Sequence, residues 1–192
     1  VARGEGWAAE VSRVGDGSGD GSGRVVEGLR ERCAAGRGIK FARNYGKAAA
    51  LYCGCAEARG GVVFTMDADL QDSPDEIPAR RHMVLDEGYD LVSGWKKKRH
   101  DPAGKRWPSK FFNWTARTVS GIRLHDFNCG LKAYRRRVVK AIEVYGEMHR
   151  YIPILAKQAG FKRIGEKVVE HRARKYGHSK FGMERMVKGY LD

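Results

Sequence analysis

The sequence has no run of about 18 or more apolar residues, so it offers no segment able to cross a bilayer as a helix. Its N-terminus lacks a basic region followed by an apolar stretch, and we expect no signal peptide. Cysteine is scarce, and the spacing of the cysteines excludes a zinc finger. We expect all of them to be reduced and mostly to serve packing, namely Cys33, Cys53, Cys55 and Cys129.

What the sequence has in excess is positive charge. There are 37 Lys and Arg against 23 Asp and Glu, a formal net charge of +14. This balance favours an anionic partner, such as nucleic acid, anionic lipid headgroups or a phosphorylated substrate. A hydrophobic content of 42% over 192 residues is ordinary for a globular protein. We find no internal boundary and expect residues 1–192 to form a single domain.

Strand and helix patterns alternate along the chain, which predicts an α/β fold with a mainly parallel sheet and helices on both faces. Ser73 is expected to cap a helix that has Pro74 at its first position. The predicted strands are 9–14, 39–42, 62–66, 89–93, 130–134 and 161–171. The predicted helices begin near residue 22 and span 46–59, 73–87, 110–119, 136–144, 151–159 and 181–191, and 95–108 is expected to be a polar, basic loop.

An acidic cluster follows the predicted strand 62–66, at the sheet edge where α/β proteins bind ligands. If the chain stays extended there, Asp67, Asp69 and Gln71 point the same way. Three hard oxygen ligands suit Mg²⁺ or Mn²⁺. A lone Asp-x-Asp pair is close to chance, and its place after the strand is what gives it weight. Asp72 and Asp75 are better interpreted as solvated acids near a helix N-terminus.

Four other clusters stand out. Residues 15–22 form a turn rich in Gly and Asp, and residues 43–47 form a basic turn that opens a helix. Residues 96–100 are a run of positive charge, which is usually a solvated face. Residues 171–180 are basic and precede an amphipathic helix.

Taken in order, these clusters resemble the polyprenyl-phosphate glycosyltransferases of the inverting GT-A family 2. This group is similar to dolichol-phosphate mannose synthase and to bacterial undecaprenyl-phosphate sugar transferases. The strongest match is TMDADLQDSPDEIP at 65–78, beside ARNYGKAAAL before it. Further matches are GWKKKRHDP, SKFFNW, HDFNCGLKAYRR, YGEMHRYIP and KYGHSKFG, so the resemblance covers about residues 38–192.

The resemblance implies a role for each cluster. A metal, Mg²⁺ or Mn²⁺, would be bound by Asp67, Asp69 and Gln71. The nucleotide-sugar would be bound by Asp16, Arg43, Lys47, Asp67 and Asp69. The acceptor phosphate would be bound by Arg99, Arg106, Arg174, Ser179 and Lys180.

Asp126 matches the acidic residue usually proposed as the catalytic base. Two other interpretations of Asp126 stay open: a buried turn aspartate that caps backbone amides, or a group that orients the acceptor. A lipid monophosphate has a second pKa of about 6 and is largely anionic at neutral pH, so it needs positioning more than proton removal.

The chain also departs from the family pattern. Nothing before Ala9 resembles the family's hydrophobic first strand and its Pro-x-Tyr-Asn-Glu turn, and Gly15 replaces the first of two acids in the nucleotide turn. The family commonly continues into transmembrane helices near the point where this chain stops. We therefore expect the domain to be truncated at its first strand and before such helices.

The leading hypothesis is sugar transfer from a nucleotide-sugar to a polyprenyl phosphate at the cytosolic face of the membrane. The basic surface would then face anionic lipid, and residues 181–191 would either lie at the interface or pack in the core. A soluble transferase acting on a glycan or protein hydroxyl would instead require Asp126 to be a true base. A nucleic-acid-binding module has no recognisable signature here and gives the acidic cluster no role. Whether the chain forms a homo-oligomer stays open.

Overall fold

The computed structural model describes residues 6–32, 35–97 and 103–170. The strands are β1 (Val11–Gly15), β2 (Gly36–Lys40), β3 (Val62–Thr65), β4 (Leu91–Trp95), β5 (Lys132–Arg135) and β6 (Ile164–Val168). The α-helices are α1 (Ser22–Arg32), α2 (Lys47–Glu57), α3 (Ile77–Leu85), α4 (Ala103–Ser120), α5 (Arg136–Ala141) and α6 (Ile152–Gln158), and the 3₁₀ turns are η1 (Pro74–Glu76) and η2 (Met148–Arg150).

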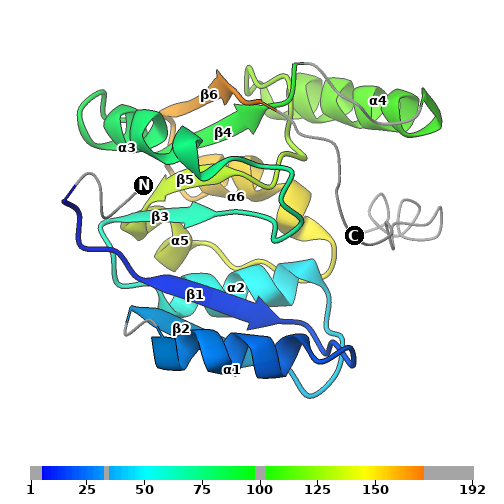
Figure 1. Ribbon diagram of the computed structural model, residues 1–192. Coiled ribbons are helices and arrows are strands. Elements are labelled where there is room, and N and C mark those ends of the chain that lie inside the picture. The colour runs from blue at the N-terminus through cyan, green and yellow to red at the C-terminus, as the bar shows by residue number, and fades with distance from the viewer. Residues whose placement is uncertain (1–5, 33–34, 98–102, 171–192) are drawn as a thin grey trace.

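The strands form two groups. β1 and β2 pair in parallel, and the other four form a sheet in the order β3-β5-β4-β6. β5 runs antiparallel to both of its neighbours, whereas β4 and β6 are parallel, so β3, β4 and β6 share one direction. The predicted α/β class with a mainly parallel sheet is confirmed, with β5 as the exception. Figure 1 shows β1 and β3 pointing toward the same side of the molecule.

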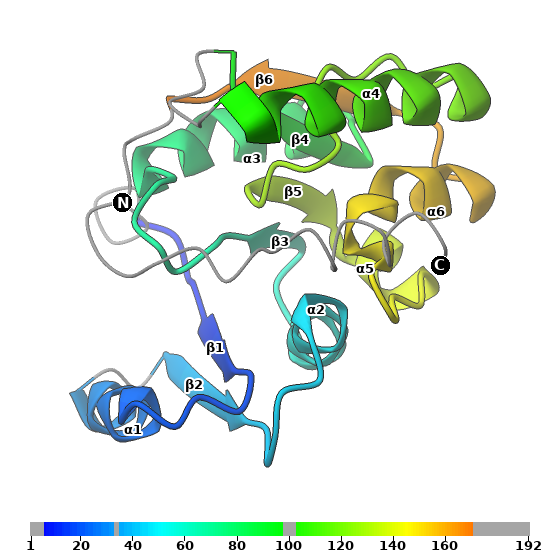
Figure 2. The ribbon, with the colours of Figure 1, turned by 90° about the vertical axis from the view of Figure 1, so that its right-hand side faces the viewer.

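Helices cover both faces of the strands. In Figure 2, α1 and α3 lie on one side, and α2, α5 and α6 lie on the other. The strand sequence explains this arrangement, because Leu91 and Val92 of β4 are both fully buried although they point to opposite faces. Leu91 packs with Tyr134 and Val138, and Val92 packs with Ala133 and Val84 of α3. A strand buried on both faces is typically apolar on both, as Leu91 and Val92 are, although the buried Ser93 of β4 is polar.

The basic loop predicted at 95–108 is partly wrong, because α4 begins at Ala103 and continues through Pro108. Proline removes one backbone hydrogen bond from a helix, a cost that the rest of this helix outweighs. Phe112 and Ala116 anchor α4 by packing with Ile122, Leu124 and Phe127. The other predicted elements up to residue 168 are found with boundaries shifted by a few residues.

Two smaller expectations can be checked. Cys53, Cys55 and Cys129 are free cysteines in the structure, whereas Cys33 lies outside the described residues. Burial raises the pKa of Cys55 to about 11, despite the nearby Lys140. This raised pKa keeps the thiol protonated.

Among the described helices, none is both long and apolar enough to cross a membrane. The predicted helix 181–191 lies outside the described residues.

Candidate active site

The centre of the candidate site is an ion pair between Lys47 and Asp67. Lys47 is the first residue of α2, and Asp67 follows β3. The Lys47 Nζ atom lies 2.7 Å from Asp67 Oδ1 and 3.0 Å from Oδ2. Burial raises the pKa of Asp67, but Lys47, together with Lys96 and Lys132, outweighs burial and holds that pKa below its usual value. Two residues predicted to bind the nucleotide-sugar are therefore in direct contact.

The Asp67 carboxylate rests against the backbone of Gly130. A Cβ atom at position 130 would come within 2.3 Å of Asp67 Oδ2 and 2.6 Å of Cγ. No side chain other than hydrogen fits there without displacing the carboxylate. The absence of a side chain at Gly130 thus creates the space that Asp67 occupies.

The alternation argument for Asp67, Asp69 and Gln71 is wrong, because the chain does not stay extended. Leu70 has a φ of 61°, in the left-handed region, and the chain turns around it. In this turn the Gln71 N–H donates to Asp69 Oδ1 at 3.2 Å. The turn joins the Gln71 main chain to the Asp69 carboxylate, and the assignment of Asp67, Asp69 and Gln71 as metal ligands stays a prediction.

The donor set is compatible with a divalent metal but does not complete its coordination shell. In the described part of the chain, no three His, Cys, Asp or Glu side chains are grouped so as to hold a metal. Two carboxylates and an amide oxygen suit a hard cation that takes its remaining ligands from water and substrate phosphates. The contact between Asp67 and a lysine ammonium also indicates that this position favours positive charge.

Asp72 is not a solvated acid, contrary to prediction. Its side chain is fully buried, and Lys96 Nζ lies 3.2 Å from its Oδ1 atom. Lys96 is only 14% exposed, so this member of the basic run does not belong to a solvated face. Burial lowers the pKa of Lys96, but the neighbouring Cys129 and Asp72 outweigh that effect and raise it. By contrast, Ser73 caps the following turn as predicted, accepting from the Asp75 N–H at 3.3 Å.

Asp16 holds the turn after β1 against the segment that precedes α2. Its Oδ1 accepts from the Tyr45 N–H at 2.6 Å, and its Oδ2 accepts from the Gly46 N–H at 3.0 Å. Arg43 is exposed, with its guanidinium 4.8 Å from the centre of the Tyr45 ring. The structure brings Asp16 close to the segment that contains Arg43, as the nucleotide pocket requires, but contact with a base stays a prediction.

Asp126 is buried, at 1% exposure, in the loop before β5. Its Oδ1 accepts from the Asn128 N–H at 3.0 Å, which is the geometry of a turn-capping aspartate. Its main-chain carbonyl accepts from Ser93 Oγ at 3.2 Å. The geometry fits the interpretation of a buried turn residue, and the proposed catalytic role stays a prediction.

Two residues near this centre were not predicted. Lys132 is 4% exposed, and burial lowers its pKa, although Cys129 and Asp126 oppose that effect. Burial, with Lys47 and Arg150, lowers the pKa of His149 to about 3, so its imidazole is neutral at pH 7. The one available signal for Lys132 was a charged residue between Leu131 and Ala133, inside an apolar strand pattern. His149 lies in the quoted segment YGEMHRYIP, which had no assigned role.

Several predicted acceptor residues cannot be compared with the structure. Arg99, Arg174, Ser179 and Lys180 lie outside the described residues. Arg106 lies in the first turn of α4. Their roles stay predictions.

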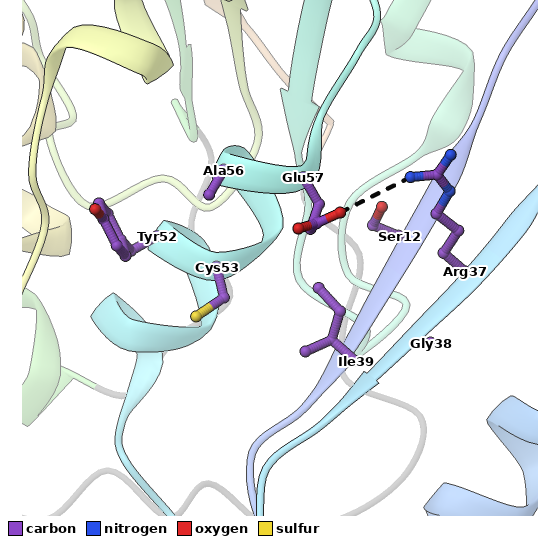
Figure 3. Close-up of a pocket in the computed structure, with 8 residues that line it drawn as sticks. All are labelled: Ser12, Arg37, Gly38, Ile39, Tyr52, Cys53, Ala56 and Glu57. Carbon is purple, nitrogen blue, oxygen red and sulfur yellow. Dashed lines mark ion pairs between the residues drawn. The ribbon is translucent and has the colours of Figure 1, made fainter.

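A separate pocket of about 580 Å³ lies between α2 and the β1–β2 pair. Figure 3 shows Ile39 and Cys53 at this pocket, with Arg37 and Glu57 paired across it at 3.9 Å. It contains none of the residues predicted for the site and faces the second half of α2. We assign it no role in binding the donor.

The Lys47–Asp67 pair can be tested without a ligand. A depressed carboxylate pKa contributes stability above the unfolded-state pKa, and that contribution is lost as the pH falls through the native pKa. Lys47→Met removes the ammonium group that lowers the Asp67 pKa, while burial still raises it. We therefore expect the Asp67 pKa to rise in this variant. A carboxyl ¹³C NMR titration in metal-free buffer measures this change, with exposed Lys110→Met as the control. An unchanged Asp67 pKa in Lys47→Met would contradict the pairing.

Comparison with known proteins agrees with this geometry. Residues 8–143 match the family model described as Glycosyl transferase family 2. Undecaprenyl-phosphate 4-deoxy-4-formamido-L-arabinose transferase of Pseudomonas savastanoi pv. phaseolicola is 38% identical over 184 residues, 95% of this chain and 54% of that protein. Dodecaprenyl-phosphate galacturonate synthase of Rhizobium johnstonii is 39% identical over 156 residues, 80% of this chain and 46% of that protein. The chain thus spans about half the length of these curated relatives.

Solved structures share the fold. Glucosyl-3-phosphoglycerate synthase of Mycobacterium tuberculosis aligns with a TM-score of 0.63 and 19% identity, over 91% of this chain and 63% of that one. The same enzyme in complex with Mn²⁺, UDP and phosphoglyceric acid aligns with a TM-score of 0.62 and 20% identity, over 86% and 61% of the two chains. At this identity the likeness shows the fold alone. The family model covers most of the chain and relatives are more than a third identical across it, so this chain belongs to glycosyl transferase family 2.

Proposed function

We propose that this domain transfers a sugar from a nucleotide-sugar to a polyprenyl phosphate, with inversion at the anomeric carbon. The observation that carries this proposal is that relatives at 38–39% identity are named as transferases or synthases of undecaprenyl and dodecaprenyl phosphate sugars. Family membership supports the reaction class, and the relatives' names support the acceptor class.

The donor would bind at the carboxyl ends of β1, β2 and β3. Asp16 and Arg43 would border the nucleotide, and Lys47 would contact the diphosphate. Asp67, Asp69 and Gln71 would hold Mg²⁺ or Mn²⁺, which when bound neutralises charge on the diphosphate leaving group. The contact between Lys47 and Asp67 supports this arrangement, because a cation that would bind the diphosphate lies beside a carboxylate that would bind the metal.

The acceptor would be held by Arg99, Arg106, Arg174, Ser179 and Lys180. Because the acceptor phosphate is already largely anionic at neutral pH, these cations would screen its charge as it approaches the sugar. Asp126 would orient the reacting groups or accept a proton. Its fixed place in a buried turn supports an orienting role.

A membrane-facing surface on α4 would bring the domain to its lipid acceptor. Phe111 and Trp114 are 59% and 63% exposed, and their ring centres lie 6.1 Å apart. Lys110 and Arg117 are exposed on the same helix, three or four residues from Trp114. Aromatic and basic side chains on the outer face of an amphipathic helix suit the interface of an anionic bilayer.

Donor binding is tested by thermal shift with UDP-, GDP- and dTDP-sugars, each with and without Mn²⁺. We expect one donor to raise the Tm of the chain only when Mn²⁺ is present. Asp69→Ala should abolish that shift because it removes a metal ligand, whereas Asp86→Ala, at the end of α3, should keep it. If no donor shifts the Tm, or if the shift survives in Asp69→Ala, the proposed donor site is wrong.

Membrane docking is tested by co-sedimentation with vesicles of phosphatidylcholine, with and without phosphatidylglycerol. We expect binding to the anionic vesicles and a loss of more than tenfold in the double variant Phe111→Ser/Trp114→Ser, since each buried aromatic contributes roughly 1 kcal/mol or more. The matched control is Val25→Ser/Leu29→Ser, which removes exposed apolar residues from α1. Equal binding by both double variants would rule out α4 as the docking surface.

A further inference from the structure

Three polar side chains lie side by side in one row across the sheet. Thr65 of β3 pairs with Lys132 of β5, and Lys132 pairs on its other side with Ser93 of β4. Directly paired residues on neighbouring strands point to the same face. All three are buried, at 9%, 4% and 0% exposure. An apolar residue at each position would satisfy packing, so their polar groups require an explanation.

Each of these side chains donates a hydrogen bond to the main chain of one loop, residues 126–130. Ser93 Oγ donates to the Asp126 carbonyl at 3.2 Å, and Thr65 Oγ1 donates to the Gly130 carbonyl at 3.0 Å. Lys132 Nζ donates to the carbonyl of Cys129, between those two. The row thus fixes the loop at its beginning and at its end.

This loop joins the two carboxylates of the candidate site. It begins at Asp126, and it ends at Gly130, against which the Asp67 carboxylate rests. Inside the loop, the Phe127 N–H donates to Asn113 Oδ1 at 3.2 Å, and the Asn128 N–H donates to Asp126 Oδ1 at 3.0 Å. A displacement of the loop would therefore move Asp126 directly and Asp67 through Gly130.

We propose that Lys132, supported by Thr65 and Ser93, is a positioning residue that holds the loop 126–130 so that Asp126 and Asp67 keep their relative placement. The effect on turnover rests on the proposed transferase function, whereas the effect on the loop does not. Lys132 acts through the main chain of Cys129 and need not touch the substrate.

A buried lysine is not explained by stability. Taking an ammonium group out of water is costly, and it is the replacement of a whole buried ion pair by apolar side chains that is often neutral or stabilising. Lys132→Met leaves the Cys129 carbonyl without this donor, so we expect the variant to fold with a Tm that is lowered only modestly. If Lys132 holds the loop, its replacement should speed amide exchange in residues 126–130 much more than it lowers the Tm of the whole chain. These two quantities can be measured separately.

The experiment compares amide hydrogen exchange of the apo chain in wild type and Lys132→Met. We expect Phe127 and Asn128 to exchange about tenfold faster in the variant, because losing one buried hydrogen bond loosens the loop by that order. Lys157→Met is the control: its Nζ also donates to a main-chain carbonyl, that of Ser120 at 2.6 Å, which lies outside the loop 126–130. Unchanged exchange at Phe127 and Asn128 in Lys132→Met would overturn the inference.

Kinetics separate positioning from a purely structural role. With the nucleotide-sugar that stabilises the wild-type chain, Lys132→Met should lower kcat by about tenfold or more and also raise the donor KM, because it displaces Asp126 together with Asp67, a proposed donor and metal ligand. An unchanged kcat per folded molecule would overturn the role in turnover.

If Lys132→Met does not fold, Ser93→Ala replaces it, with the same faster exchange expected. A wild-type chain without turnover would count against the proposed function, while hydrogen exchange would still decide the placement of the loop.

Discussion

The ion pair between Lys47 and Asp67 connects the two groups of strands on which the site is built. Lys47 begins the helix that follows the β1–β2 pair, and Asp67 lies just after β3, the first strand of the four-stranded sheet. The two sheets share no strand pairing among the described residues, so the donor side of the site depends on contacts of this kind. Ala48, the next residue of α2, packs in the same core cluster as Leu91 and Tyr134. The apolar packing holds the helix in place, and the ion pair sets the position of its first residue relative to β3.

Lysines and carboxylates alternate around this centre. Lys47 pairs with Asp67, and Lys96 pairs with Asp72. Lys132 is close enough to Asp126 for that carboxylate to influence its pKa. Each of these carboxylates thus has a lysine ammonium in contact or nearby, and the lysines around Asp67 hold the pKa of that carboxyl below its usual value. In the proposed function, an incoming diphosphate would meet the Lys47 ammonium beside Asp67 and Asp69, the carboxylates proposed to bind the metal.

Much of this could be predicted from sequence because the signals are local. The apolar run at 62–66 identifies β3, and Ser73 with Pro74 identifies the start of the next helical segment. The positions of Asp72 and Leu70 could not be predicted in this way. The burial of Asp72 depends on Lys96, which is distant in sequence, and the turn at Leu70 overrides the extended pattern from which the direction of Asp69 was inferred. The role of Lys132 was not predicted because its hydrogen-bond partner is the main-chain carbonyl of Cys129. The amino-acid sequence does not indicate which side chains bond to main-chain groups.

The most direct test of the proposed function is the transfer reaction itself. The chain is incubated with Mn²⁺ and labelled nucleotide-sugars, and undecaprenyl phosphate in detergent is offered beside simple glycan and alcohol acceptors. The account predicts label in the lipid phosphate alone, with the anomeric configuration opposite to that of the donor by NMR. Label in a hydroxyl acceptor, or a lipid product that retains the donor configuration, would contradict it.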